Sequence, residues 1–192
     1  MLLRYEEATH TYLDEETGEV FPSITQMLKR GGWVDDRWFT EESSVRGSAV
    51  HKLTADFDLG ALDLPSCTSK YKNYVLGYVA CVTRLQPVWE AIEEATVHPT
   101  LRFAGRPDRV GVEAGLQTVL EVKTGVVSKA HGVQTALQAI LEAWRQGPPP
   151  HRWQRLALYL QPTGRYKLDV LTDRRDFDEA FRLIRLYAGV AA

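Results

Sequence analysis

Two carboxylates in the middle of the chain could hold a divalent cation. One ammonium group near them could contact a phosphate ester bound beside that cation. The segment Arg106-Pro107-Asp108 is followed, after 12 intervening residues, by Glu121-Val122-Lys123. Side chains alternate between the two faces of a strand, so Glu121 and Lys123 project from one face and Val122 points into the core. If the strand that carries Asp108 pairs with this one through a tight turn, both carboxylates lie beside the ammonium.

A metal-dependent hydrolytic centre is the chemistry that this set could perform. Two adjacent carboxylates repel each other unless a cation lies between them, and oxygen-rich clusters suit Mg²⁺ or Mn²⁺. We expect Asp108 and Glu121 to bind the metal, with the Val122 carbonyl as a further ligand. Such a metal polarises a phosphodiester and lowers the pKa of its bound water. Lys123 would hold that water in line and offset charge in the transition state.

A plainer interpretation competes with this one. An acid-x-lysine triplet on a strand is more often a solvated face or a cross-strand ion pair. Val119, Leu120 and Val122 surround Glu121, however, and predict a central rather than an exposed strand. This buried context favours the metal centre.

Turn residues and apolar periodicity predict the elements that must position these groups. A hairpin is expected over residues 3–22, and Ser23-Ile24-Thr25-Gln26 reads as a capping box that opens a short helix ended by Gly31-Gly32. A second helix is expected from the N-cap Thr40 to Asp58. Its buried side is predicted to follow every fourth residue, Val45, Ala49, Leu53 and Phe57.

The rest of the chain predicts an α/β fold, more closely an α+β fold with a mixed sheet. The expected elements are a helix at 69–86, strands at 89–97, 101–112 and 117–123, a helix at 129–145, strands at 155–161 and 165–171, and a helix at 174–188. The order helix, three strands, helix, strand (αβββαβ) indicates a sheet flanked by helices. We expect one domain over 1–192, with an N-terminal hairpin and short helix at 1–39, a core at 40–171 and a C-terminal helix at 172–192.

Composition and charge limit the classes of protein to which this chain could belong. Hydrophobic residues make up 44% and charged residues 25%, as in globular proteins, and no stretch reaches the roughly 18 apolar residues of a membrane span. Cys67 and Cys81 are too few for a disulfide framework or an iron–sulfur cluster and fit a reducing compartment, so we expect a cytoplasmic protein. The net charge of −2 counts mildly against a passive DNA-binding module but not against an enzyme that carries cations.

The motifs resemble those of the PD-(D/E)XK nuclease superfamily. Pro107-Asp108 and Glu121-x-Lys123 spell its signature, and the αβββαβ order resembles its restriction-endonuclease-like core. Within the superfamily the chain is similar to RecB-like exonucleases, particularly phage-encoded ones, over about residues 4–188. The segments that carry this resemblance are Arg46-Gly47-Ser48-Ala49-Val50-His51, Ala104-Gly105-Arg106-Pro107-Asp108, Leu120-Glu121-Val122-Lys123-Thr124-Gly125 and Gln134.

The resemblance implies roles for residues outside the signature. His51 matches an additional metal ligand, and at about 100° per residue it falls opposite the Ala49–Leu53–Phe57 stripe; a solvated histidine is the alternative. Gln134 matches a glutamine that helps to position the lysine or the substrate. The family often has a tyrosine four residues later, where this chain has Gln138. Some RecB-like relatives carry an iron–sulfur cluster on four cysteines, which this chain does not have.

Contacts to DNA are expected from five side chains, Arg46, Arg106, Lys129, His131 and Gln138. A wider phosphate track could include other arginines, for which scattered surface charge is the default interpretation: Arg102, Arg109, Arg152 and Arg155. Trp33, Trp38 and Phe39 could stack on unpaired bases, although packing over the core is the expected use of such aromatics. Glu94 could support the metal ligands, but a solvated charge is the favoured interpretation.

The resemblance implies a divalent-metal-dependent DNA nuclease, foremost an exonuclease in phage or bacterial DNA recombination, repair or replication. Its partners would be single- or double-stranded DNA and phage or host recombination proteins, with no membrane. The same centre would serve a structure-specific endonuclease or resolvase. The rivals are a non-catalytic DNA-binding or assembly protein that retains the fold and, with less support, a metal hydrolase that acts on small nucleotides. The oligomeric state is left open.

Overall fold

The computed structural model describes residues 2–6, 9, 11–34 and 40–188. Its helices are α1 (Ile24–Arg30), α2 (Glu41–Asp58), α3 (Lys72–Leu85), α4 (Ala130–Gln146), the short 3-10 helix η2 (Pro150–Arg152) and α5 (Arg175–Ala188). Its strands are β1 (Leu3–Glu6), β2 (Thr11–Asp14), β3 (Val20–Pro22), β4 (Val88–Ile92), β5 (Thr96–His98), β6 (Phe103–Gly105), β7 (Arg109–Glu113), β8 (Leu116–Lys123), β9 (Gln154–Leu160) and β10 (Tyr166–Val170).

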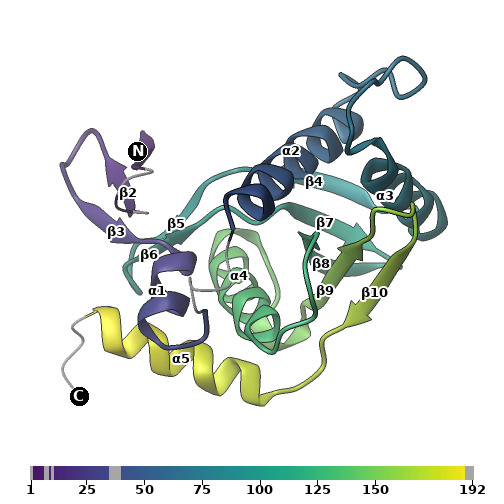
Figure 1. The fold of residues 1–192 in the computed structure, drawn as a ribbon. Helices are drawn as coiled ribbons and strands as arrows, with labels where there is room; N and C mark the ends of the chain where they lie inside the picture. Colours follow the sequence, from purple (N-terminus) through teal and green to yellow (C-terminus); the bar gives the residue numbers. More distant parts are fainter. Residues whose placement is uncertain (1, 7–8, 10, 35–39, 189–192) are drawn as a thin grey trace.

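A mixed five-stranded sheet forms the centre of the fold, in the order β10-β9-β8-β7-β4 (Figure 1). β8 and β9 run parallel, and the other neighbouring pairs are antiparallel. The chain order α3, β4, β7, β8, α4, β9 confirms the predicted αβββαβ arrangement and the mixed sheet. The parallel step from β8 to β9 is the one that needs a crossover, and α4 provides it.

Helices cover both faces of this sheet. On one face, Tyr74 and Tyr78 of α3 pack with Leu120 and Val122 of β8. On the other face, Ala139 of α4 meets Val119 of β8 and Val110 of β7. α1 and α5 pack against α4 in turn, as Figure 1 shows. None of the helices in the described ranges is long and apolar enough to cross a lipid bilayer.

Two of the predicted strands are each interrupted. The segment expected at 89–97 divides into β4 and β5, because Glu93 takes up a left-handed backbone conformation with φ 52°. The segment expected at 101–112 divides into β6 and β7, with Pro107, which has no N–H for a sheet ladder, in the gap. β5 and β6 form a separate two-stranded sheet. Asp108 therefore stands at the start of a strand instead of within one.

The N-terminal hairpin was predicted with two strands, and the structure has three, in the order β1-β2-β3. The β2–β3 turn closes at Gly18, whose φ of 73° suits glycine. Ser23 caps α1 as predicted, since its side chain accepts a hydrogen bond from the Gln26 N–H. Tyr12 and Phe21 pack with Val97 and Ala104, so this small sheet sits against β5 and β6.

The ends of α2 were predicted correctly, and its buried side was predicted in part, since Phe57 packs against the core. Thr40 and Ser43 form a reciprocal capping box at the helix start. Val45 of the predicted stripe is 53% exposed, and Val50, Thr54 and Ala55 are buried instead. These three residues surround the side on which His51 lies, because residues three and four apart share a helix face.

A buried arginine joins α2 and α3 to the sheet. Arg109, at the start of β7, is fully buried, so the interpretation of this residue as a phosphate contact is wrong. Its Nε donates to Asp58 Oδ2 of α2 (2.5 Å) and lies 3.1 Å from the Tyr78 hydroxyl of α3. Its Nη1 donates to the backbone carbonyl of Asp108 at 2.6 Å. One guanidinium thus ties both helices to the residue expected to bind metal.

Removal of the Asp58 carboxylate should destabilise the protein strongly. Asp58→Ala leaves the buried Arg109 charge without its nearest carboxylate, and we expect the free energy of unfolding to fall by about 3–5 kcal/mol. Asp56→Ala is the matched control on the same helix, because Asp56 pairs only with Lys52, whose side chain is 76% exposed. That variant should lose less than about 1 kcal/mol in urea denaturation. Equal losses in the two variants would contradict this assignment.

Candidate metal centre and active site

Three carboxylates lie in one row across neighbouring strands. The β7–β8 register pairs Arg109 with Leu120, so the next pair toward the sheet edge is Asp108 and Glu121. On the other side, β4 pairs Ile92 with Arg109, and the Glu93 N–H donates to the Asp108 carbonyl at 3.1 Å. Opposite residues in an antiparallel pair share a face. Glu93, Asp108 and Glu121 are therefore brought to the same edge of the central sheet.

Glu93 owes its place in this row to a β-bulge. The β4–β7 register shifts by one residue between Trp89 and Ala91, and without that shift Ile92 would lie opposite Asp108. The bulge needs Gly111 on β7, because a Cβ there would lie 2.1 Å from the Val88 carbonyl oxygen. Sequence reasoning missed Glu93, because a glycine inside a strand hints at a bulge but does not give its register.

Glu94, which the sequence offered as a supporting residue, points elsewhere. Its side chain is 57% exposed and lies 3.4 Å from Arg145 Nη1. It is the solvated charge that the favoured interpretation expected.

His51 completes a set of three possible metal ligands. Its Nδ1 lies 3.2 Å from Glu93 Oε1 and 3.2 Å from Asp108 Oδ1. One ligand atom from each of the three residues falls within 4.8 Å of the other two. An imidazole with two carboxylates is a donor set that fits a divalent cation. The residues present therefore form a candidate metal site, with Glu93 in addition to the predicted His51 and Asp108.

Glu121 lies beside this set and is held by three donors. Its Oε1 accepts hydrogen bonds from Lys123 Nζ and Gln134 Nε2, both at 2.6 Å, and its Oε2 accepts one from Gln138 Nε2 at 2.6 Å. Val122 turns its side chain into the core and is fully buried, as predicted. Its backbone N–H donates to Asp108 Oδ2 at 2.6 Å, which fixes that carboxylate against β8.

The carboxylates control the charge of their basic neighbours. Burial alone would lower the pKa of His51, but the Asp108 and Glu93 carboxylates outweigh it and raise that pKa to about 10. Burial likewise opposes the charge of Lys123, and Glu121 together with Asp108 raises the pKa of its ammonium. Three carboxylates so close together favour any cation between them. The imidazolium of His51 and the ammonium of Lys123 offset part of the repulsion between these carboxylates.

The candidate site opens into a polar cavity of about 660 Å³. Ser44, Gly47 and Ser48 of α2 form one wall, and small side chains there leave room next to His51. Lys52, Thr124 and Gln134 line it as well. A cavity of this kind can admit an extended polar ligand alongside the carboxylate row.

The residues predicted to contact DNA are distributed unequally around this cavity. Arg106 lines it, with a side chain that is 52% exposed and a Nε 3.2 Å from Glu93 Oε2. Arg46 is not among its lining residues. Gln138 is only 2% exposed, against Glu121. His131 Nδ1 lies 2.8 Å from the Tyr159 hydroxyl, and burial, with Lys123 nearby, lowers the pKa of His131 to about 4.

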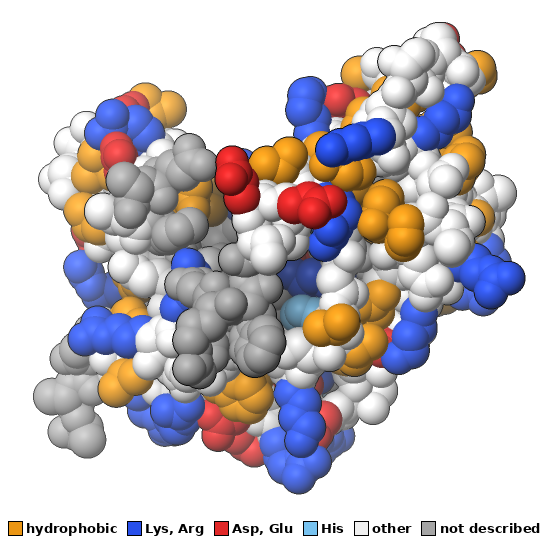
Figure 2. Space-filling view, in the orientation of Figure 1, with side chains coloured by type: hydrophobic (Ala, Val, Ile, Leu, Met, Phe, Trp, Pro, Cys, Tyr) orange, Lys and Arg blue, Asp and Glu red, His pale blue; other side chains and the backbone are white. Residues whose placement is uncertain are grey.

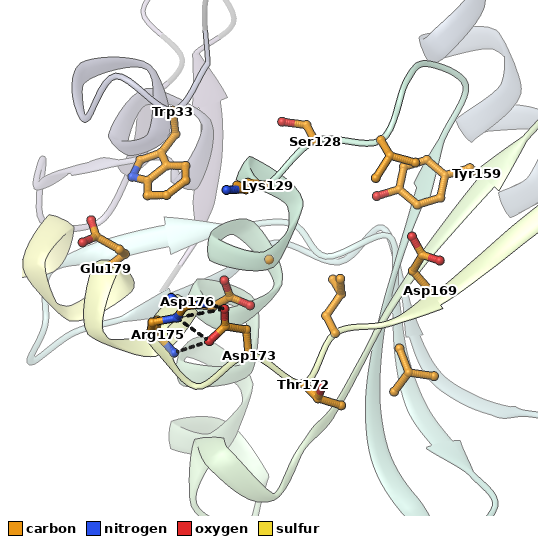
Figure 3. A pocket seen from close by; sticks show the side chains of 14 residues that line it. Trp33, Ser128, Lys129, Tyr159, Asp169, Thr172, Asp173, Arg175, Asp176 and Glu179 are labelled. Carbon is orange, nitrogen blue, oxygen red and sulfur yellow. Dashed lines mark hydrogen bonds and ion pairs between the residues drawn. The ribbon is translucent and has the colours of Figure 1, made fainter.

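Lys129 lines a different cavity, of about 570 Å³, which Figure 3 shows with Trp33 and the start of α5. The carboxylates of Asp169, Asp173, Asp176 and Glu179 line the same cavity, together with Arg175. Trp33 packs against the α1–α4–α5 core, as the packing interpretation expected. Trp38 and Phe39 lie outside the described residues.

Two observations bear on the expected phosphate track of basic side chains. Arg155 is 3% exposed and is bound to Asp176, so it is unavailable to phosphate. On the face shown in Figure 2 the Lys and Arg side chains are dispersed among other residues.

Comparisons with known proteins bear on the fold. No protein-family model matches the sequence, and no curated protein matches it. Among solved structures, a "putative exonuclease" from Eubacterium rectale is 12% identical, with a TM-score of 0.52 over 88% of this chain and 72% of that chain. The structure of SSO0001 is 13% identical over 85% of this chain and 84% of that chain, with a TM-score of only 0.36. The first similarity indicates a shared fold, and the second is too weak to do so.

Loss of the Glu93 charge should weaken metal binding. Glu93→Gln removes one of the three ligands, and we expect the dissociation constant for Mn²⁺, measured by titration calorimetry, to rise at least about tenfold. Glu94→Gln makes the same chemical change one residue away, on an exposed side chain, and should bind Mn²⁺ like the parent protein. If Glu93→Gln binds as tightly as Glu94→Gln, Glu93 is not a ligand.

Proposed function

We propose that this protein is a divalent-metal-dependent nuclease that hydrolyses phosphodiester bonds in DNA. The observation that carries the proposal is that His51, Glu93 and Asp108 converge in the same polar cavity as the Lys123–Glu121 pair. A cation site next to a charged donor is what the hydrolysis of a phosphodiester requires. The similarity in fold to the Eubacterium rectale structure supports the same conclusion.

His51, Glu93 and Asp108 would hold Mg²⁺ or Mn²⁺. Glu121 can join them, because a carboxylate has about four acceptor positions and the Lys123, Gln134 and Gln138 donors occupy three. The predicted Val122 carbonyl would complete the protein ligands. The bound metal would polarise the phosphodiester and lower the pKa of its water.

Lys123 would act as a charged donor in this scheme. Since its carboxylate neighbours raise the pKa of its ammonium, Lys123 stays protonated at neutral pH and does not take a proton from water. It would instead donate hydrogen bonds to the phosphate and offset the negative charge that develops there. Gln134 and Gln138 would serve as positioning residues that hold the Glu121 carboxylate, and through it the ammonium, in place.

Arg106 would bind the phosphate backbone at the mouth of the cavity. It is the one predicted DNA contact that is both half-exposed and next to the carboxylate row. We further infer an exonuclease that works in phage or bacterial DNA recombination, repair or replication. The RecB-like order of the motifs supports this finer assignment.

Removal of the Lys123 ammonium should abolish DNA cleavage. End-labelled linear DNA, single- or double-stranded, should be cut by the parent protein with Mn²⁺ or Mg²⁺ and left intact with EDTA. Lys123→Ala should lower the initial rate at least about a hundredfold, because it removes a donor aimed at the developing charge. Lys167→Ala is the matched control, since Lys167 is 55% exposed on β10, pairs with Asp169 and does not line the candidate active-site cavity. Cleavage that survives Lys123→Ala, or no cleavage by the parent, would overturn the proposal.

An exonuclease needs a free DNA end. A covalently closed circle of the same sequence should therefore remain uncut under conditions in which the linear form is degraded. Nicked or linear products from the closed circle would replace the exonuclease with an endonuclease that uses the same centre.

A further inference from the structure

A second, smaller cavity of about 130 Å³ adjoins the candidate active site. The two cavities share the lining residues Thr25, Arg106 and Gln134. The smaller cavity lies where the N-terminal sheet meets α1 and α4, and its other lining residues are Tyr5, Tyr12, Ser23, Ile24, Gly105 and Gln138. We call it the Tyr5 pocket. A ligand that extended from the active-site cavity past Arg106 would enter it.

Two tyrosines form the aromatic side of the Tyr5 pocket. Tyr5 of β1 and Tyr12 of β2 are directly opposite in the antiparallel pair, with ring centroids 5.0 Å apart and an angle of 49° between the rings. Tyr12 is 5% exposed and belongs to the core, whereas Tyr5 is 39% exposed. The buried ring supports the exposed one. The Tyr5 ring can therefore offer a rigid face to a planar ligand.

The Gln138 amide gives the pocket a fixed polar group. Its Nε2 donates to Glu121 Oε2 at 2.6 Å, and a carboxylate accepts but does not donate, so the amide cannot be turned around. Its Oε1 is buried and has no hydrogen-bond partner among the described residues. A buried acceptor left unpaired costs free energy. A ligand N–H that reached this oxygen would remove that cost.

The chemistry of the pocket favours a nucleobase over a phosphate. The unpaired, carbonyl-type Oε1 of Gln138 repels an anion inside the pocket. An aromatic face together with an acceptor suits a flat, uncharged ring that carries N–H groups. The cavity has room for one such ring and not for a length of polymer.

We propose that the Tyr5 pocket holds one unpaired nucleobase of the DNA strand whose phosphodiester lies in the active-site cavity. The inference rests on the proposed nuclease function, because the catalytic cavity is what brings the strand to the pocket. A base enters such a pocket only when it is unstacked and unpaired. The substrate is therefore single-stranded DNA, or a duplex end that has frayed by at least one nucleotide.

Substrates that lack a single base test this directly. Single-stranded oligonucleotides, each with one abasic nucleotide at a successive position from the end, are titrated against the protein in fluorescence anisotropy. The protein carries Lys123→Ala and is assayed with Mn²⁺, so that the strand stays intact. At one position the abasic change should weaken binding at least about fivefold, the lower end for a stacked base. If all abasic strands bind like the intact strand, or no strand binds, the pocket assignment is overturned.

The Tyr5 ring should account for that loss. Tyr5→Ala, made in the Lys123→Ala protein, should weaken binding of the intact strand to a similar extent. In that double variant the abasic nucleotide should cause no further loss of affinity. Tyr5→Phe keeps the ring and should restore both the affinity and the sensitivity to the missing base. Losses that simply multiply would show that Tyr5 and the base act independently, which would overturn the inference.

The two proposals fail in different ways. Metal-dependent cleavage by the parent protein with no abasic sensitivity would reject the Tyr5 pocket and leave the nuclease. Abasic-sensitive binding that depends on Tyr5, in a parent protein that cuts no DNA, would support the pocket and reject the nuclease.

Discussion

Three carboxylates at one edge of the sheet repel one another, and the surrounding structure must offset that repulsion. Glu93, Asp108 and Glu121 come from three adjacent strands, and backbone pairing alone would bring like charges together. Each is met by a donor from another element. His51 approaches Glu93 and Asp108 from α2, and Gln134 and Gln138 approach Glu121 from α4, beside Lys123 of its own strand. The helices therefore have two roles: they pack on the apolar faces of the sheet, and α2 and α4 supply the donors that pair with its carboxylates.

The row of carboxylates is also supported from the opposite face of the sheet. Arg109 lies on the opposite face from Glu121 and bonds the Asp108 carbonyl, while Asp58 and Tyr78 fix its guanidinium. Burial raises the pKa of Tyr78, so its hydroxyl keeps the proton that it donates to Asp58. A buried cation that is bound on three sides cannot follow the movements of a ligand. The bond to its carbonyl holds the backbone at Asp108 in place, as the preorganised electrostatics of the proposed nuclease would require.

Sequence reasoning identified the parts of this arrangement that depend on local spacing. Asp108, Glu121 and Lys123 follow from a short motif and strand alternation, and the ends of α2 follow from a capping residue. Glu93 could not be found in this way, because its position depends on a register shift between two strands. The buried side of α2 was predicted only in part, for a related reason. It carries His51, which meets Glu93 and Asp108, and Thr54, whose hydroxyl donates to the His51 carbonyl. Apolar periodicity does not detect these polar residues.

Gly111 has a consequence that extends beyond this chain. The shifted ladder exists only where β7 has no side chain to block the Val88 carbonyl. A homologous chain with a larger residue there would need a straight ladder, and its second acid would have to stand one residue earlier, or its β4 would have to be one residue shorter. Residue identity on one strand would then covary with the length of its neighbour. An alignment that scores each column separately would misread that compensation as the loss of an acid.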